Sequence, residues 1–380
     1  MLIDGTVYLD YQAATPVDPR VADEMAISMT MDFANPSSDD HSLGWRARRC
    51  VELARTTIAD AWGAEADEII FTSGATEANN IAVLGGAIGA PSTRRRLLIS
   101  AIEHKAILEA AYAAERLGYS VEIIPVGADG IVDLAALRRS LDETVAVVSV
   151  MAVNNETGIV QPIQQVAELA AQVGALSHCD ATQAPLAGDV NLITWGVDAA
   201  SFSSHKLYGP KGVGALYLSS QRPWTPRPLI FGGGQEEGIR PGTLPTPLCV
   251  GFAKAVDIVR KEGEVERTRV AQLRDYFVAG IQRLDSRFKL TAAHAQRHPG
   301  NAHMRLSGVD AADLLIRLQP AVAASLGSAC TSGVIGPSHV LSAMGLSDDE
   351  ASSCIRFSLG RFSDEDQVAQ ALEAIQAALR

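Results

Sequence analysis

Short apolar runs alternate with longer amphipathic segments through the first two-thirds of the chain. Compact runs rich in valine, isoleucine and alanine predict buried β-strands. These runs are 69–72, 97–101, 121–125, 145–151, 175–179, 199–203 and 214–218. Between several of them, apolar residues recur at helical spacing, over 106–117, 134–141 and 163–173. The alternation predicts an α/β fold in which helices cover both faces of a mostly parallel, seven-stranded sheet.

The pattern changes after Pro247. A long, charge-rich helical run without internal proline covers 248–284, and short strands followed by helices are expected over 289–291, 303–306, 311–318 and 365–379. These elements predict a second, smaller α+β domain. We expect a large domain at 15–258 and a small domain built from 1–14 and 259–380. The boundary is expected inside the long helix and not in a flexible linker.

Composition narrows the class of protein. The 380 residues give room for roughly two or three domains, and 47% apolar with 20% charged residues is ordinary for a soluble globular protein. The formal net charge of −12 argues against direct binding of nucleic acid, whose phosphates it repels. No apolar run reaches the roughly 18 residues that span a bilayer, and the N-terminus lacks the basic segment of a secretory signal. We therefore expect no membrane association.

Five cysteines stand far apart along the chain and never form a C-x-x-C pair; they are Cys50, Cys179, Cys249, Cys330 and Cys354. Their odd number and spacing argue against a disulfide framework or a zinc site, so no metal is expected, and they favour a reducing cytoplasm. Four of them lie in helical or strand contexts that suit small buried residues. Cys330 differs, because it lies in the small-residue, two-glycine segment 325–333.

Lys206 has the most distinctive surroundings in the chain. It follows Ser203-Ser204-His205 and precedes a turn that contains Gly209, and predicted strands lie on both sides. A lysine held between two strands and partly shielded from water favours its neutral amine, which attacks carbonyl carbons as Schiff-base chemistry requires. Ser203 and His205 can offer hydrogen bonds to a phosphate. On this segment alone, a surface hairpin with solubilising lysines is the competing interpretation.

Polar motifs follow the predicted strands, at the sheet edge where doubly wound folds bind ligands. After strand 69–72, the sequence Ser73-Gly74-Ala75-Thr76 leads into a helix, and free N–H groups there bind anions, although a simple helix cap would look the same. After strand 97–101 comes His104, which can stack on an aromatic ring and move protons near neutral pH as a catalytic residue, or serve a structural role.

Two more strand ends carry polar residues. Asn154-Asn155-Glu156 can orient a polar substrate or form a turn. Asp180 can pair with a pyridinium nitrogen, which makes the ring a better electron sink, or can cap a helix. Four features follow one another along the chain: an anion-binding helix start, a histidine that can stack on a ring, a carboxylate that can pair with a pyridine nitrogen, and a lysine suited to a Schiff base. Together they indicate pyridoxal phosphate.

The chain resembles the cysteine desulfurases of NifS and IscS type, in the pyridoxal-phosphate-dependent class V aminotransferase family of fold type I. The resemblance runs from the N-terminus to about residue 362. Its matching motifs are LDYQAATP (9–16), NPSS (35–38), FTSGATE (71–77), EHK (103–105), NNETG (154–158), HCDATQ (178–183), the segment 201–214, GGGQE (232–236), RPGT (240–243), GSACTS (327–332) and IRFSLG (355–360).

The resemblance implies a role for each matching residue. Lys206 would form the Schiff base with the cofactor, Asp180 would pair with the pyridine nitrogen, Gln183 with the ring hydroxyl, and His104 would stack on the ring. The phosphate group would be held by Ala75, Thr76, Ser203 and His205, with Thr243 reaching in from the partner subunit of a homodimer. The substrate L-cysteine would be bound by Asn35, Asn155 and Arg356. The planar guanidinium of Arg356 suits a carboxylate because it can donate two parallel hydrogen bonds to it.

Cys330 distinguishes a desulfurase from an aminotransferase within this resemblance. The implied reaction converts L-cysteine to L-alanine and leaves a persulfide on Cys330 for a protein acceptor, because the ionised thiol attacks the substrate sulfur. Selenocysteine lyase or C–S lyase activity on the same scaffold, or an inactive interaction protein that keeps the fold, are the alternatives.

Some positions depart from the family pattern. Leu326 stands where many relatives have serine, and His303 where asparagine is frequent. The chain stops at Arg380, earlier than iron–sulfur members usually do, and segment 240–245 resembles members that serve DNA phosphorothioation. Sulfur supply for phosphorothioation, or for iron–sulfur and thio-cofactor assembly, is therefore the expected pathway.

Overall fold

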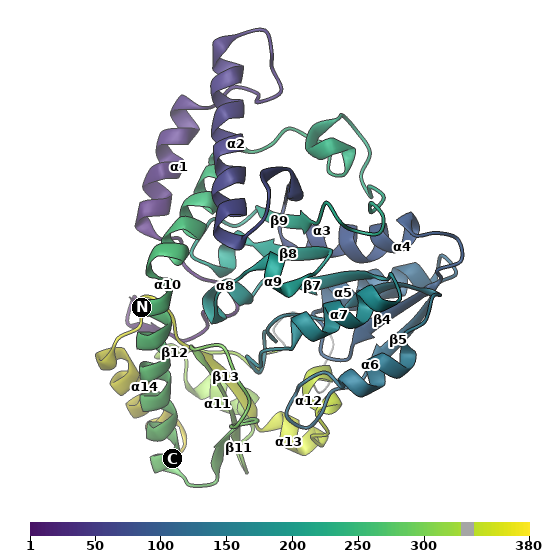
Figure 1. The fold of residues 1–380 in the computed structure, drawn as a ribbon. Helices are drawn as coiled ribbons and strands as arrows, with labels where there is room; N and C mark the ends of the chain where they lie inside the picture. The colour runs from purple at the N-terminus through teal and green to yellow at the C-terminus, as the bar shows by residue number, and fades with distance from the viewer. Residues whose placement is uncertain (328–337) are drawn as a thin grey trace.

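The computed structural model describes residues 1–327 and 338–380, and Figure 1 shows their arrangement. The main sheet has seven strands in the order β3-β9-β8-β7-β6-β4-β5. Their bounds are β3 Ile69–Thr72, β4 Arg96–Ser100, β5 Ser120–Ile124, β6 Val145–Ser149, β7 Leu176–Asp180, β8 Ala199–Ser203 and β9 Gly214–Leu218. Strand β9 runs antiparallel to both neighbours, and the other pairings are parallel. The predicted α/β fold with a mostly parallel sheet is confirmed.

Helices cover both faces of this sheet. In β4, Leu98 belongs to one buried cluster, whereas its neighbours Leu97 and Ile99 belong to another, as the two-residue period of a strand requires. The helices around the sheet are α1 Pro19–Met31, α2 Ser42–Trp62, α3 Ala75–Asn80, α4 Gly86–Gly89, α5 Lys105–Glu115, α6 Leu134–Ser140, α7 Ile163–Gln172, α8 Ala184–Ala187 and α9 Leu192–Trp195.

A second core lies below the main sheet in Figure 1. Its antiparallel sheet has the order β10-β11-β13, and a small sheet pairs β2 with β1 and β12. The elements are β1 Leu2–Ile3, β2 Thr6–Tyr8, β10 Phe288–Leu290, β11 Asn301–Leu306, β12 Val322–Ala323, β13 Cys354–Ser358, α11 Ala311–Arg317, α12 His339–Ala343, α13 Asp348–Ser352 and α14 Glu365–Ala378. The parallel pairing of Val7 with Val322 brings the N-terminal strand to the C-terminal part of the chain.

The long helix α10 (Thr246–Leu284) runs through both cores. Phe252 packs in the cluster that covers the main sheet, and Phe277 packs against Phe357 in the second cluster, with ring centroids 5.1 Å apart. The helix therefore contributes to both cores, and the domain boundary expected within it stays a prediction. None of the helices in the described ranges has the length and apolarity needed to cross a bilayer.

Several element boundaries differ from the predictions. The strand predicted at 145–151 ends at Ser149. Val150 and Met151 extended the predicted run because they are also apolar and buried, but they lie in the segment that follows the strand, where Met151 lines a cavity. Helices α1 and α2 were not among the predicted elements. Their periodicity is blurred by exposed apolar residues such as Ile27 and Leu53.

Candidate active site

A cavity of about 590 Å³ lies where β7 and β8 end. Most of the predicted site residues line it, although they come from segments far apart in the sequence. These residues are Ala75, Thr76, His104, Asn155, Asp180, Gln183, Ser203, His205, Lys206 and Arg356. The cavity is therefore the place where the fold assembles the sequence motifs.

Lys206 lies directly after β8, at the end of the short 3₁₀ turn Ser204–Lys206. Its Nζ donates hydrogen bonds to the backbone carbonyls of Gln12 and Ala13, each at 2.7 Å. The turn is held close, since Gly209 packs so near Ser204 that a Cβ there would lie 2.0 Å from Ser204 Oγ. Ser204, Leu207 and Tyr208 are buried, so the interpretation as a solvent-exposed hairpin is wrong.

Asp180 is the last residue of β7, and two donors fix its carboxylate. Asn79 Nδ2 donates to Oδ2 at 2.7 Å, and the backbone N–H of Thr182 donates to Oδ1 at 3.0 Å. His178, on the same strand, exchanges hydrogen bonds with Ser149 and Ser201 through its two ring nitrogens. Burial lowers the pKa of His178 to about 4 despite the attraction of Asp180, so the imidazole is neutral at pH 7.

The start of α3 forms one end of the cavity. Gly74 precedes the helix, and no side chain of the described residues caps it. The first N–H groups therefore remain available to an anion. Ser203 Oγ lies 2.9 Å from His205 Nδ1. Burial, reinforced by the charges of Lys206 and Lys211, lowers the pKa of His205 to about 4, so His205 offers a hydrogen bond and no charge at pH 7.

His104 lies on the cavity wall as the N-cap of α5, and its Nδ1 accepts a hydrogen bond from the backbone N–H of Ala106 at 3.1 Å. This bond fixes the ring orientation. Behind it, the Glu103 carboxyl is fully buried and accepts the backbone N–H of Met151 at 2.6 Å. Burial raises the pKa of Glu103 well above its usual range.

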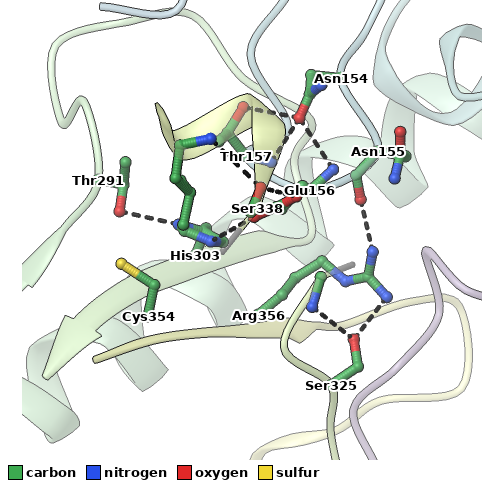
Figure 2. Close-up of polar contacts among 12 residues, drawn as sticks. Asn154, Asn155, Glu156, Thr157, Thr291, His303, Ser325, Ser338, Cys354 and Arg356 are labelled. Atoms are coloured by element: carbon green, nitrogen blue, oxygen red, sulfur yellow. Dashed lines mark hydrogen bonds and ion pairs between the residues drawn. The ribbon is translucent and has the colours of Figure 1, made fainter. Parts of the chain in front are cut away.

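Arg356 reaches the cavity from β13 (Figure 2). Its Nη1 donates to the backbone carbonyl of Asn155 at 2.6 Å, and its Nη2 donates to Asp10 Oδ1 at 2.7 Å and to Ser325 Oγ at 2.8 Å. The buried Nε has no hydrogen-bond partner among the described residues. Asn155 thus holds Arg356 through its main chain and is itself one of the residues that line the cavity.

Three predicted site residues are not brought to this cavity by the described chain. Thr243 and Asn35 are exposed and do not line it. Their segments instead flank a separate cavity of about 610 Å³, which is lined by Pro36, Ser37 and residues 234–237. Cys330 lies outside the described residues.

The structure adds residues to which the sequence gave no role; they are Asp10, Gln12, Asn79 and Ser325. All of them are buried or half-buried polar residues that hold the predicted ones. Asp10, Gln12 and Asn79 lie within or beside the matching motifs, and this position was the signal by which they could have been found. The contacts themselves join residues up to 346 positions apart, and no local sequence pattern predicts such pairs.

The donor set fits a phosphorylated aromatic aldehyde. A lysine amine, a fixed carboxylate, an imidazole and a cluster of N–H and O–H donors share one cavity. Thr182 Oγ1, on the same wall, is buried without a hydrogen-bond partner among the described residues, as expected where a ligand supplies one. Within the described ranges, no group of three or more histidine, cysteine or acidic side chains is placed to hold a metal ion.

Comparison with known proteins gives a consistent result. The family described as "Aminotransferase class-V" matches residues 7–371. "Cysteine desulfurase IscS" from Rickettsia africae is 40% identical over 97% of this chain and 90% of that protein. A solved structure described as "NIFS-LIKE PROTEIN" has a TM-score of 0.91 and 34% identity, covering 98% of this chain and 99% of the other. "SspA in complex with cysteine" has a TM-score of 0.83 and 33% identity, covering 94% and 100%.

Proposed function

The chain belongs to the class V aminotransferase family and is a cysteine desulfurase of the IscS and NifS type, and on this premise we propose how its cavity takes sulfur from L-cysteine. The family implies pyridoxal phosphate as cofactor. The observation that supports the proposal most directly is the convergence of Lys206, Asp180, His104 and Arg356 on one cavity.

The cofactor would be held by the residues that line this cavity. Lys206 would bind its aldehyde carbon, Asp180 its ring nitrogen and Gln183 its ring hydroxyl. The phosphate would lie at the start of α3, with Thr76, Ser203 and His205 as further donors. When bound, pyridoxal phosphate supplies an electron sink that weakens the bonds to the substrate α- and β-carbons.

The side chains of this chain then bind and orient the substrate. Arg356, fixed by Asp10, Ser325 and Asn155, would receive the α-carboxylate of L-cysteine through its remaining donors. Lys206 Nζ would move the proton at the substrate α-carbon, since Lys206 lines the cavity, where its amine lies beside the carbonyls of Gln12 and Ala13.

Sulfur leaves through Cys330. Its thiolate would attack the substrate sulfur, so that an S–S bond forms and the C–S bond breaks. The electron pair of the broken bond stays with carbon, which takes up a proton and becomes the methyl group of L-alanine. The persulfide on Cys330 would pass to a protein acceptor. Phosphorothioation, or the assembly of iron–sulfur clusters or thio-cofactors, remains the predicted pathway for that acceptor.

Two substitutions test these assignments. Cys330→Ser should keep the visible absorbance of the bound cofactor and lose alanine formation from L-cysteine with a thiol acceptor. Lys206→Ala should lose the absorbance of the lysine-bound cofactor. Full alanine production by the Cys330 variant would overturn the role of the cysteine. Equal or greater turnover of L-selenocysteine than of L-cysteine would favour the selenocysteine lyase alternative.

A homodimer would complete the site. Thr243 and Asn35, both expected at the active site, are exposed and lie outside the cavity of their own chain. Apolar side chains near both segments are also exposed, with 70% of Phe33 and 85% of Phe231 accessible. Such a surface is typical of an interface between protein chains.

Mixing two inactive variants tests whether Thr243 acts across this interface. A mixed dimer of Lys206→Ala and Thr243→Ala subunits has one cavity with its own Lys206 and the partner's intact Thr243. Recovery of activity on subunit exchange supports action across the interface. No recovery, although exchange is verified by mass, would contradict it.

A further inference from the structure

Glu156 is a buried carboxyl that the proposed reaction does not use. It is 2% exposed and does not line the active-site cavity. Its Oε2 accepts a hydrogen bond from Ser338 Oγ at 2.8 Å (Figure 2). Ser338 is the N-cap of α12 and the first described residue after 328–337, the stretch that contains Cys330. Glu156 thus holds one flank of that stretch.

The same side chain contacts the other flank. Gly327 is the last described residue before the stretch, and a Cβ placed on it would lie 2.4 Å from Glu156 Cγ. Its φ of +87° is in the left-handed region that favours glycine. Since one side chain packs on Gly327 and bonds to Ser338, Glu156 fixes the separation and orientation of both flanks.

Glu156 is also tied to the predicted carboxylate receptor. The adjacent Asn155 accepts a hydrogen bond from Arg356 through its backbone carbonyl. On the opposite side, Ser325 Oγ accepts from Arg356 Nη2 at 2.8 Å and from the Gly327 N–H at 3.3 Å. These contacts close a ring from Arg356 through Asn155, Glu156 and Gly327 to Ser325, and back to Arg356.

The turn that carries Glu156 is itself fixed. Asn154 Oδ1 accepts hydrogen bonds from the N–H of Glu156, the N–H of Thr157 and Thr157 Oγ1, at 3.0, 2.8 and 3.1 Å (Figure 2). Asn301 Nδ2 donates to the Glu156 carbonyl at 3.0 Å. A carboxyl on such a turn has little freedom to move and is suited to hold other groups in place.

His303 faces the second carboxyl oxygen. Its Nε2 lies 3.8 Å from Glu156 Oε1, and neither atom has a hydrogen-bond partner among the described residues. Its Nδ1 lies 2.9 Å from Thr291 Oγ1. The charged and titratable neighbours of Glu156 are therefore His303 on β11, together with Arg356 and Cys354 on β13. Among the described residues, Oε2 is thus the carboxyl oxygen of Glu156 that is hydrogen-bonded, and its partner is Ser338.

We propose that Glu156 is a positioning residue for sulfur transfer, which fixes both flanks of the Cys330 stretch relative to Arg356. The sulfur acceptor then meets a substrate whose carboxylate is already held at Arg356. This inference rests on the proposed function of Cys330. Glu156 acts through its neighbours, because it touches neither the cavity nor the groups that bind the cofactor.

The test compares two substrates in the holoenzyme. L-cysteine requires the thiol acceptor, whereas L-cysteine sulfinate loses its sulfur as sulfur dioxide, with the bond pair left on carbon, and needs no acceptor thiol. Glu156→Ala should lower kcat for alanine from L-cysteine about tenfold, the effect of one buried hydrogen bond, and leave KM nearly unchanged. Alanine formation from the sulfinate should stay within about twofold of the parent enzyme. An equal loss with both substrates would show a general structural role and overturn the inference.

Further variants keep the test decisive if Glu156→Ala does not fold. Glu156→Gln retains a carbonyl oxygen for Ser338 and should restore most of kcat. Ser338→Ala should reproduce the loss that is specific to L-cysteine. Ser347→Ala is the matched control, because it removes the equivalent N-cap of α13 without touching Glu156. Equal effects of the two serine variants would contradict the proposal.

Cys330→Ser separates this inference from the proposed function. If that variant loses alanine formation from L-cysteine but keeps the sulfinate reaction, the role of Cys330 stands. An unaffected Glu156→Ala enzyme would then overturn only the positioning role. If Cys330→Ser turns over L-cysteine normally, the proposed function itself fails.

Discussion

Asn79 Nδ2 donates a hydrogen bond to Asp180 Oδ2 across 2.7 Å. The pair joins helix α3, whose start faces the proposed phosphate, to strand β7, whose end carries the proposed partner of the ring nitrogen. Asn79 is 1% exposed. One buried amide therefore sets the position of Asp180 relative to the phosphate end of the cavity.

Asn79→Ala should weaken cofactor retention. Loss of a buried hydrogen bond to a carboxylate costs about 1.5–3 kcal/mol, and the Asp180 carboxylate would lose half of its fixed donors. We expect the dissociation constant for pyridoxal phosphate to rise at least about tenfold. The measurement is a titration of the apoenzyme followed by absorbance. Gln164→Ala, which removes an exposed amide on α7, is the control and should leave this constant unchanged.

Glu236→Gln should destabilise the fold strongly. The buried Glu236 accepts two hydrogen bonds from Arg55, at 2.9 and 2.7 Å, and the N–H of Phe71 at 2.6 Å. Removing its charge leaves the buried Arg55 guanidinium with only the more exposed Glu52 as a counter-ion, which costs up to about 3 kcal/mol. Urea unfolding measures this change. Glu262→Gln removes the exposed partner of Arg20 and should cost less than about 1 kcal/mol, so similar losses in both variants would contradict the argument.

Glu156 should make stability depend on pH near neutrality. Burial raises the pKa of Glu156 from 4.5 to about 7, against the opposing effects of Ser338 and Arg356. The folded protein binds more protons than the unfolded chain between these values. The protonated carboxyl therefore contributes stability below about pH 4.5, and this contribution is lost as the pH rises through 7.

Glu156→Gln should remove this dependence. Between pH 5 and pH 8, the free energy of unfolding of the variant should rise relative to that of the parent by about 3 kcal/mol or less, as the pKa shift implies. Urea midpoints at the two pH values give the comparison. A difference between parent and variant that does not change with pH would show that Glu156 does not titrate in this range.

Gly327→Ala should reduce alanine formation from L-cysteine more than its matched control, Gly345→Ala. Both glycines have a left-handed backbone, with φ of +87° and +85°. A Cβ at Gly345 meets no atom within 4 Å, whereas at Gly327 it would overlap Glu156 Cγ. Both variants carry the backbone strain of about 1 kcal/mol, but only Gly327→Ala displaces Glu156. We expect alanine formation from L-cysteine to fall several-fold further in Gly327→Ala, measured beside cofactor absorbance. Equal rates in the two variants would contradict the contact.

The sequence by itself determined the strands of the main sheet and the reactive residues that stand at their ends. Runs such as 199–203 and 214–218 specify strands because apolar and small residues fill a sheet buried on both faces. Residues that must stand at strand ends, such as Asp180 and Lys206, could be found because a strand end is itself a local feature. The prediction of pyridoxal phosphate chemistry followed from their order along the chain.

Tertiary structure alone decided how those residues are held. Arg356 meets Asp10 across 346 positions, Lys206 meets the carbonyl of Gln12 across 194, and Glu156 meets Ser338 across 182. Each contact depends on how the second core packs against the main sheet, and the polar residues involved look locally like turns or caps. Hydrophobic periodicity specifies which face of an element is buried, but it does not specify which distant polar group will satisfy a buried donor. That choice is made only when the two cores meet.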